Sequence, residues 1–179
     1  MAKKTKEITR GVFNVENLVS NVKGINKKLS EEVAEVKTYN IYIHIDEQTR
    51  EKFDKNFSRY IFSVRNLGTF PKKLFFRLML EKYKEFLESQ NLYFSTENES
   101  IIKNLLSRKG QRTGRTNAKP ILFGTYQDDT LEIFQNISYS IARSENMENV
   151  NSYKKEYFFV TVLDHFVENI DIYIKEANK

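Results

Sequence analysis

Side chains able to form hydrogen bonds occur at every second position between Tyr39 and Asp46, and they are Asn40, Tyr42 and His44. Isoleucines alternate with them, and this period of two predicts a β-strand that is buried on one face. The three polar side chains then share the opposite face, where each can donate or accept hydrogen bonds. The pattern predicts a row of recognition groups on an exposed strand.

A second candidate site lies at the start of a predicted helix, after the break Arg65–Gly68. Thr69 can cap this helix, and Pro71 is tolerated in its first turn, where the missing N–H costs no hydrogen bond. The first turn of a helix leaves backbone N–H groups available to an anion such as a phosphate. Lys72 and Lys73 add positive charge there. We therefore expect Thr69, Lys72 and Lys73 to bind phosphate.

Residues suited to catalysis or metal binding are scarce. His44 and His165 are the only histidines, and the chain has no cysteine. Neither histidine has a partner at metal-ligand spacing. The pair Asp128 and Asp129 is explained more simply as a helix cap than as an acid–base pair. We expect no enzyme activity, no cofactor and no metal site.

Two helices are predicted to follow the alternating strand. Acidic residues at the start of the first helix, from Asp46 onward, suit the positive end of the helix dipole. The second helix follows its cap at Thr69 and continues to about Glu88. Both helices have apolar residues at helical spacing, which predicts one buried face each. These residues are Phe53, Phe57, Tyr60, Ile61 and Val64 in the first helix, and Leu74, Phe75, Leu78, Met79, Tyr83 and Phe86 in the second.

A similar order of elements follows later in the chain. Ile121–Tyr126 is a predicted strand, but Gly124 interrupts it, so its outer face carries either Phe123 and Thr125 or Ile121 and Phe123. Asp128 or Asp129 can cap the next helix, and a final helix follows a polar break. The buried residues expected in these helices are Leu131, Phe134, Ile137 and Ile141, then Phe158, Phe159, Val162, Leu163, Phe166 and Ile170.

Thr38–Ser89 and Lys119–Asn169 therefore read as two copies of a strand-helix-helix unit. Alignment of the first helices pairs Phe53 with Phe134, and alignment of the second helices pairs Leu74 and Phe75 with Phe158 and Phe159. One such unit is too small to bury its own core, so we expect the two copies to fold on each other. The predicted fold class is α+β, mainly α with short β-strands.

The chain divides into four predicted regions. Residues 1–37 are a basic arm with short helices, and residues 38–89 are the first strand-helix-helix unit. Residues 90–119 hold a short helix and a basic linker, and residues 120–179 are a second, degenerate and acidic unit. No stretch is apolar enough for a membrane span or a secretory signal, so we expect a cytoplasmic protein with no membrane partner.

Charge is unevenly distributed. Residues 105–119 carry five basic side chains and no acidic one, whereas residues 120–179 carry five basic and ten acidic ones. This asymmetry favours a polyanionic partner for the first part of the chain. Two basic segments could follow a DNA backbone or enter a minor groove, and the alternative is that they only aid solubility. They are the arm with Lys3, Lys4, Lys6 and Arg10, and the loop with Arg108, Lys109, Arg112, Arg115 and Lys119.

The strand, the helix, the Gly68-Thr69 break and the second helix resemble the ribbon-helix-helix family of DNA-binding proteins. The resemblance covers Tyr39–Leu87 best and Pro120–Ile170 more weakly. It implies that two strands pair into an antiparallel ribbon that enters the major groove of double-stranded DNA, while the helices form a shared core. Bulky Tyr42 departs from the usual ribbon residues of the family.

By this resemblance, Asn40, Tyr42 and His44 read bases, while Thr69, Lys72 and Lys73 contact phosphates. The implied function is non-enzymatic, sequence-specific DNA binding for a plasmid or phage, in partition, relaxosome assembly or repression. A motor ATPase or another plasmid protein is then a further candidate partner, through the basic arm. The alternative is a protein-interaction module, such as a phage-encoded inhibitor of a host complex that handles nucleic acid.

The oligomeric state depends on which strands pair. Pairing within one chain makes a pseudo-symmetric monomer, and pairing of like strands between chains makes a dimer. We expect a homodimer, because the regular first strand would then pair with its own copy and read a palindrome.

Overall fold

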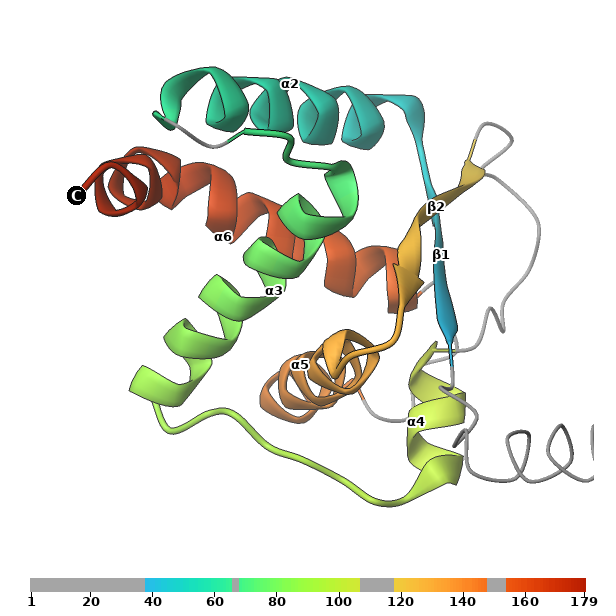
Figure 1. Cartoon of the computed structure of the whole chain (residues 1–179). Coiled ribbons are helices and arrows are strands. Elements are labelled where there is room, and N and C mark those ends of the chain that lie inside the picture. The colour runs from blue at the N-terminus through green and yellow to red at the C-terminus, as the bar shows by residue number, and fades with distance from the viewer. Residues whose placement is uncertain (1–37, 66–67, 107–117, 148–153) are drawn as a thin grey trace, which may run out of the picture. The chain divides into compact units, whose positions relative to one another are not determined.

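Two strands and five helices make up the described part of the computed structural model, which comprises residues 38–65, 68–106, 118–147 and 154–179. In chain order they are β1 (Tyr39–Ile45), α2 (Glu47–Ser63), α3 (Lys72–Ser89), α4 (Glu99–Leu106), β2 (Lys119–Tyr126), α5 (Thr130–Ser144) and α6 (Lys154–Ala177) (Figure 1). This mainly helical composition with two antiparallel strands confirms the predicted α+β class.

The two strands pair with each other within the chain. β1 and β2 are antiparallel, with Tyr39 opposite Tyr126 at one end and Ile45 opposite Lys119 at the other. The pairing is irregular in the middle, because Gly124 lies opposite Ile41 and Leu122 lies opposite Tyr42, so that Phe123 has no residue opposite it. This is a β-bulge, which adds one residue to β2 and interrupts its period of two. Of the two pairings considered above, the structure has the one within a single chain.

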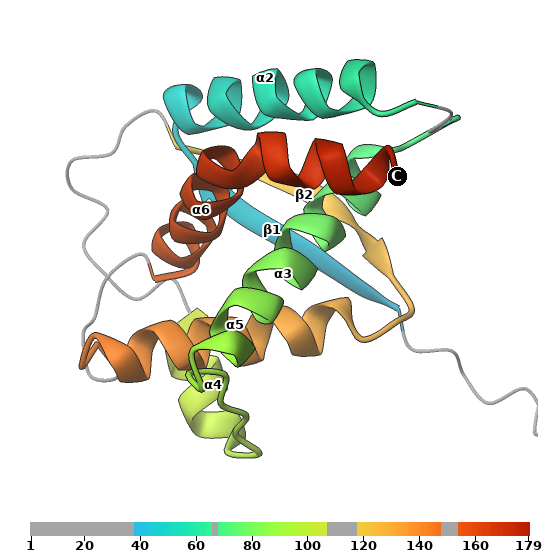
Figure 2. The same cartoon turned by 90° about the vertical axis from the view of Figure 1, so that its left-hand side faces the viewer.

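The helices are arranged around the ribbon with an approximate two-fold relation. α3 packs against β2 and α5, and α6 packs against β1 and α2, while α3 and α6 also contact each other. Each strand is thus covered by the last helix of the other strand-helix-helix segment. Figures 1 and 2 show α2 and α5 on opposite sides of the molecule, with α3 and α6 between them.

The buried faces of α3 and α6 repeat at a constant spacing, which pairs Phe75 with Phe158. The predicted alignment paired Leu74 with Phe158 and is wrong by one position, because Leu74 is exposed. The matched buried pairs are Phe75 and Phe158, Phe76 and Phe159, Met79 and Val162, Leu80 and Leu163, Tyr83 and Phe166, and Leu87 and Ile170. We call this correspondence the α3–α6 alignment.

Ring contacts follow the same relation. Phe53 of α2 lies 5.9 Å from Phe159 of α6, and Phe134 of α5 lies 6.0 Å from Phe76 of α3, between ring centroids. Phe123 contacts both Phe76 and Phe159, at 4.8 and 4.7 Å. The two segments therefore share one aromatic core beneath the ribbon, and residues 38–179 form one compact unit.

The helix starts agree only in part with the sequence. Asp46 caps α2, where its carboxylate accepts a hydrogen bond from the Thr49 N–H at 2.7 Å. Thr69 does not cap α3, because the N-cap residue is Pro71 and no side chain supplies the bond. At α5 the two aspartates divide the role: Asp129 is the N-cap residue, and Asp128 accepts from the backbone and hydroxyl of Thr130.

Candidate functional site

The outer face of β1 carries the three predicted recognition residues. Ile41, Ile43 and Ile45 are buried towards the helices. Asn40 and Tyr42 are exposed on the opposite face, and His44 there is half-buried. The predicted division of this strand into an inner and an outer face is confirmed. It follows from strict alternation, because one slip in register would expose all three isoleucines.

The outer face of β2 differs from both predicted alternatives, because Phe123 is buried and points to the core. The bulge is the physical reason, since the extra residue carries the strand from one outward position, Leu122, to the next at Thr125. Leu122 lies opposite Tyr42, and the two side chains are 48% and 47% exposed. Pro120 lies opposite His44 at the end of the ribbon.

Asn40 and Thr125 form the opposite end of the ribbon from His44 and Pro120. The Thr125 hydroxyl donates a hydrogen bond to Oδ1 of Asn40 at 2.6 Å. Because this contact occupies the Oδ1 atom of Asn40, the NH2 group is the end of the amide that remains for a ligand. The NH2 group of the exposed Asn40 is therefore left available as a donor.

The first turn of α3 lies against β2. The Tyr126 hydroxyl donates to the Lys73 carbonyl at 3.0 Å, and burial raises the pKa of Tyr126, which keeps this donor protonated. A Cβ atom at Gly124 would be 2.8 Å from the Cβ of Lys73, so this approach requires glycine. Lys72 and Lys73 are both exposed here. The structure thus brings the two predicted phosphate-binding lysines beside the ribbon, on the β2 side.

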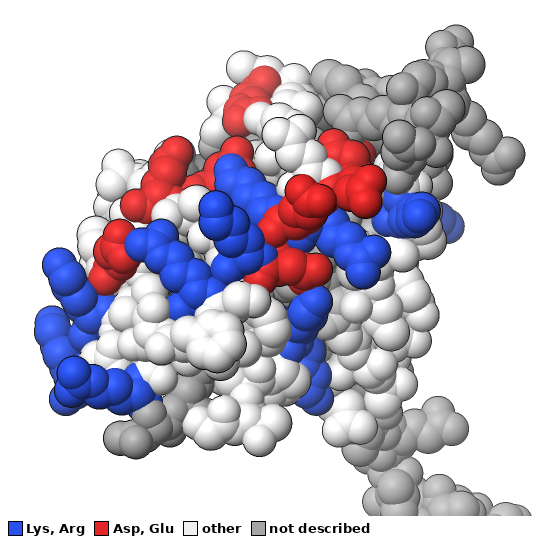
Figure 3. Space-filling view, turned by 90° about the horizontal axis from the view of Figure 1, so that it is seen from above, with Lys and Arg blue, Asp and Glu red and all other residues white. Residues whose placement is uncertain are grey.

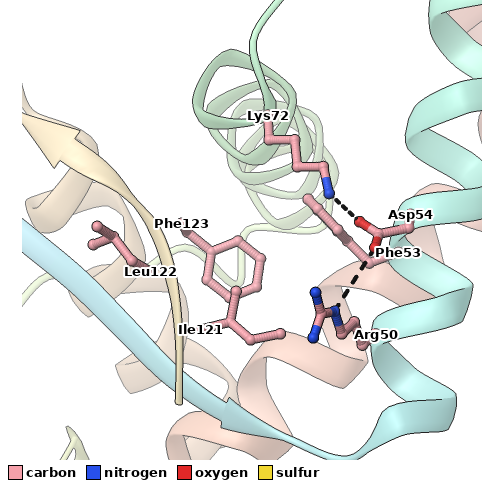
Figure 4. Close-up of a pocket in the computed structure, with 7 residues that line it drawn as sticks. All are labelled: Arg50, Phe53, Asp54, Lys72, Ile121, Leu122 and Phe123. Atoms are coloured by element: carbon pink, nitrogen blue, oxygen red, sulfur yellow. Dashed lines mark hydrogen bonds and ion pairs between the residues drawn. The ribbon is translucent and has the colours of Figure 1, made fainter. Parts of the chain in front are cut away.

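Lys72 is already engaged by a carboxylate. Its ammonium lies 2.5 Å from Asp54 of α2, and the Arg50 guanidinium lies 3.9 Å from the same side chain. These residues border a pocket of about 50 Å³ whose other wall is Ile121, Leu122 and Phe123 of β2, together with Phe53 (Figure 4). Lys73, in contrast, forms no ion pair with the residues that the structure describes. Of the two lysines, Lys73 is the readier contact for an anion.

Other predicted residues lie elsewhere. Thr69 is exposed just before α3. Lys119 is exposed at the start of β2, opposite Ile45. The remaining predicted basic residues are outside the described part of the chain: Lys3, Lys4, Lys6 and Arg10 in the arm, and Arg108, Lys109, Arg112 and Arg115 in the loop.

Sequence reasoning missed three residues of this surface. Arg50 and Asp54 lie one turn apart on α2, and a contact between them could have been expected from their spacing. Their position beside β2 could not, because it depends on how the two segments pack. Leu122 was missed because the bulge that turns it outward has no signal beyond Gly124, whereas Thr125 was on the outer face in one of the two predicted alternatives.

The second histidine supports packing rather than chemistry. His165 lies against Tyr83 and Phe86, with ring centroids 5.1 and 4.5 Å away, and the Tyr173 hydroxyl is 3.2 Å from its Nε2. Burial lowers the pKa of His165. Within the described residues no three His, Asp or Glu side chains are grouped as a metal site, and no helix is long and apolar enough to cross a membrane.

Comparison with known proteins returned no match to this chain among family models, curated proteins or solved structures.

Proposed function

We propose that this protein binds double-stranded DNA without catalysis, by placing the outer face of the β1–β2 ribbon in the major groove. One observation carries the proposal. A two-stranded antiparallel ribbon is packed on helices by one face and presents Asn40, Tyr42 and His44 on the other. The major groove is wide enough for such a ribbon, and proteins that read DNA with strands use this geometry.

The packing of the helices supports the finer interpretation that the two segments are ribbon-helix-helix units fused in one chain. In that arrangement paired strands are supported by helices from both units. Here β2 is covered by α3 and β1 by α6, so that each strand is supported by the other segment. This likeness is an analogy of arrangement, and the DNA-binding role is argued from the side chains themselves.

The chemistry of the outer face supports base reading by one end of the ribbon. The NH2 group of Asn40 can donate to the N7 and O6 acceptors of guanine, N7 of adenine or O4 of thymine. Lys73, Lys119 and Arg50 lie near β2 and suit the adjacent phosphates. The plasmid or phage role, in partition, relaxosome assembly or repression, belongs to this proposal as its biological setting.

Binding of the full chain to random and selected short duplexes, at several salt concentrations, tests the proposal. A selected sequence should bind at least about a thousandfold more tightly than random duplex. Asn40→Ala should reduce this preference, whereas Lys73→Ala should weaken binding to every sequence and lower the salt dependence by about one charge contact. Lys84→Ala, near the far end of α3, is the matched control and should bind as the unaltered protein does.

Tyr42 and Leu122 favour one second candidate, a protein-interaction module. They form an exposed apolar pair at the centre of the ribbon, with side chains 47% and 48% exposed. A protein partner, such as a host complex that handles nucleic acid, would bury this pair. Failure of the full chain to retard any duplex at low salt would favour this candidate over DNA binding.

A further inference from the structure

We infer that the DNA site is non-palindromic and is occupied by one chain, with different chemistry at its two ends and thymine at its centre. The inference rests on the proposed DNA-binding function and specifies the substrate of the same face. A homodimeric ribbon presents identical ends, and its symmetry matches a palindrome. This ribbon is complete within one chain, and its ends are chemically different.

The approximate two-fold axis passes through the middle of the ribbon, near the pair Tyr42 and Leu122. The pair Tyr42 and Leu122 is flanked on β1 by the buried Ile41 and Ile43, and on β2 by the partly buried Ile121 and the buried Phe123, which occupy the corresponding positions. A rotation about this axis therefore exchanges the two ends of the ribbon. Any difference between the ends becomes a difference between the two halves of a bound DNA site.

Hydrogen-bonding capacity differs sharply between the two ends. At one end, Asn40 and Thr125 bond to each other at 2.6 Å and present an oriented NH2 group. At the other end, His44 lies opposite Pro120, whose ring offers neither a donor nor an acceptor. One half of the site is therefore read by an amide and a hydroxyl, and the other half by an imidazole alone.

Apolar contact is the chemistry of the centre. Leu122 and Tyr42 are exposed side by side, and the aliphatic side chain of Leu122 cannot match the polar groups of a base, whereas Tyr42 carries a hydroxyl at the end of its ring. The apolar feature of the major groove is the C5-methyl group of thymine. Leu122 is therefore assigned to thymine methyl contact, which gives the centre of the site a preference for A·T pairs.

The cations beside the ribbon add to the asymmetry. Arg50 and Lys72 border the pocket next to Leu122, and Lys73 lies against β2. The residue of α6 that corresponds to Lys72 in the α3–α6 alignment is Lys155, which is partly buried and whose pKa is lowered by burial. Among the residues that the structure describes, the candidate phosphate contacts are thus concentrated on the β2 side, and this orients the chain on the duplex in one direction.

Selection of bound sequences from random duplexes with the full chain tests the inference. The expected consensus has no internal two-fold symmetry and binds one chain per duplex. It should bind at least about fivefold more tightly than either palindrome built by duplicating one half, because each wrong base pair weakens binding by about that much or more. A palindromic consensus bound equally well or by two chains would overturn the asymmetric site alone, whereas enrichment of no duplex would overturn the DNA-binding proposal with it.

Replacement of a central thymine by uracil tests the role of Leu122, because it removes only the methyl group. The unaltered protein should lose about three- to fourfold in affinity, the value of one buried methyl group. Leu122→Ala should bind the thymine and uracil duplexes equally. Thr125→Ala is the matched control and should keep the full loss. Equal sensitivity to uracil in Leu122→Ala and in the unaltered protein would overturn the assignment.

Discussion

The two strand-helix-helix segments of this protein match inside and differ outside. Six buried positions of α3 repeat in α6 at a constant spacing, and each segment inserts a phenylalanine into the other. The outer faces of the two strands share no residue type, since Asn, Tyr and His face Pro, Leu and Thr. The interior is constrained by close packing, whereas an exposed face can change at little cost in stability. The interior match therefore reflects packing, and the proposed DNA contact lies on the face that packing leaves free to differ.

Ion pairs between the segments show a second difference. One arginine, Arg77 of α3, forms the ion pairs to the start of α5. It lies 2.6 Å from Asp128 and 2.9 Å from Asp129. It also pairs with Glu81 of its own helix at 2.7 Å. Its side chain is only 24% exposed. Partial burial and several partners give such a network more weight than a single surface pair.

The ties between α2 and α6 are exposed. Lys52 lies 2.8 Å from Asp164, and Arg59 lies 2.6 Å from Asp171. The least exposed of these four side chains is Lys52, which is still 43% exposed. Figure 3 shows basic and acidic side chains interspersed over the face seen from above in Figure 1, which carries α2. The sequence has a basic first part and an acidic last part, but on this face the two kinds of charge are mixed and do not form separate basic and acidic surfaces.

The largest effect should come from the shared interior. Phe76→Ala and Phe159→Ala should each lower the free energy of unfolding by about 3–5 kcal/mol, because both rings are fully buried and each contacts the other segment. Urea unfolding measures both, and Phe62→Ala, at a ring that is 89% exposed, is the control and should change stability by no more than about 0.5 kcal/mol. If only one of the two substitutions lowered the free energy of unfolding by this much, the buried positions of α3 and α6 would not be equivalent.

The next effect should separate the two kinds of ion pair. Arg77→Met should lower the free energy of unfolding by about 1–3 kcal/mol, since it removes the charged hydrogen bonds that one largely buried guanidinium makes to three carboxylates. Arg59→Met should change it by less than about 1 kcal/mol, because that pair is exposed. Urea unfolding of both variants measures the difference. If both variants lost the same free energy of unfolding, the exposure of the two sets of ion pairs would not explain how strongly they stabilise the fold.

Strict local patterns in the sequence predicted most of the fold. The alternation of Ile41, Ile43 and Ile45 identified the buried face of β1, and apolar stripes identified the helices. The bulge in β2 could not be read in this way, because Gly124 is required by the approach of Lys73 from a distant helix. Local reasoning also assigned the cap of α3 to Thr69, although this helix begins at Lys72, after Pro71 as the N-cap residue, with no side-chain cap.

The candidate site was predictable only on one strand. Asn40, Tyr42 and His44 follow from periodicity alone, whereas the residues beside them come from segments distant in sequence. Thr125 reaches Asn40 across 85 positions, and Arg50 lies beside β2 only after the chain has folded. The expectation of a homodimer rested on pairing of like strands between chains, and the structure instead pairs β1 with β2 of one chain.

A smaller effect should test the cations on the β2 side. Asp54→Asn removes the carboxylate that holds Lys72 and Arg50, so affinity for duplex DNA should rise about fivefold, which corresponds to roughly 1 kcal/mol for one released charge contact. Fluorescence anisotropy at low salt measures it. Asp171→Asn is the matched control, since it releases Arg59 on the α2–α6 face and should leave affinity unchanged. An unchanged or lower affinity for Asp54→Asn would remove these cations from the proposed contact surface.

The smallest effect concerns two positions that correspond in the α3–α6 alignment, His165 in α6 and Lys82 in α3. Lys82 is held by Glu85 and Glu176 at 2.9 and 3.2 Å, which favours its charged form. Burial lowers the pKa of His165, and the charge of Glu168 offsets this only in part. The unfolded chain therefore binds a proton at this position at a higher pH than the folded chain does. Linkage then requires that folding stability falls as the pH decreases below about 6.5, the ordinary pKa of histidine.

His165→Gln removes the titrating group but keeps a polar side chain, so its stability should fall less than that of the unaltered protein between pH 7 and pH 5. Urea unfolding at several pH values measures this, and the difference between the two proteins cancels the contributions of all groups that both retain. Lys82→Gln should lower stability by a similar amount at both pH values, because a lysine whose pKa is raised stays charged throughout this range. If His165→Gln showed the full pH dependence of the unaltered protein, the contrast between the half-buried imidazole and the paired ammonium would not hold. The two corresponding positions would then differ in residue type alone, and the only functional asymmetry left between the segments would be the one on the outer face of the ribbon.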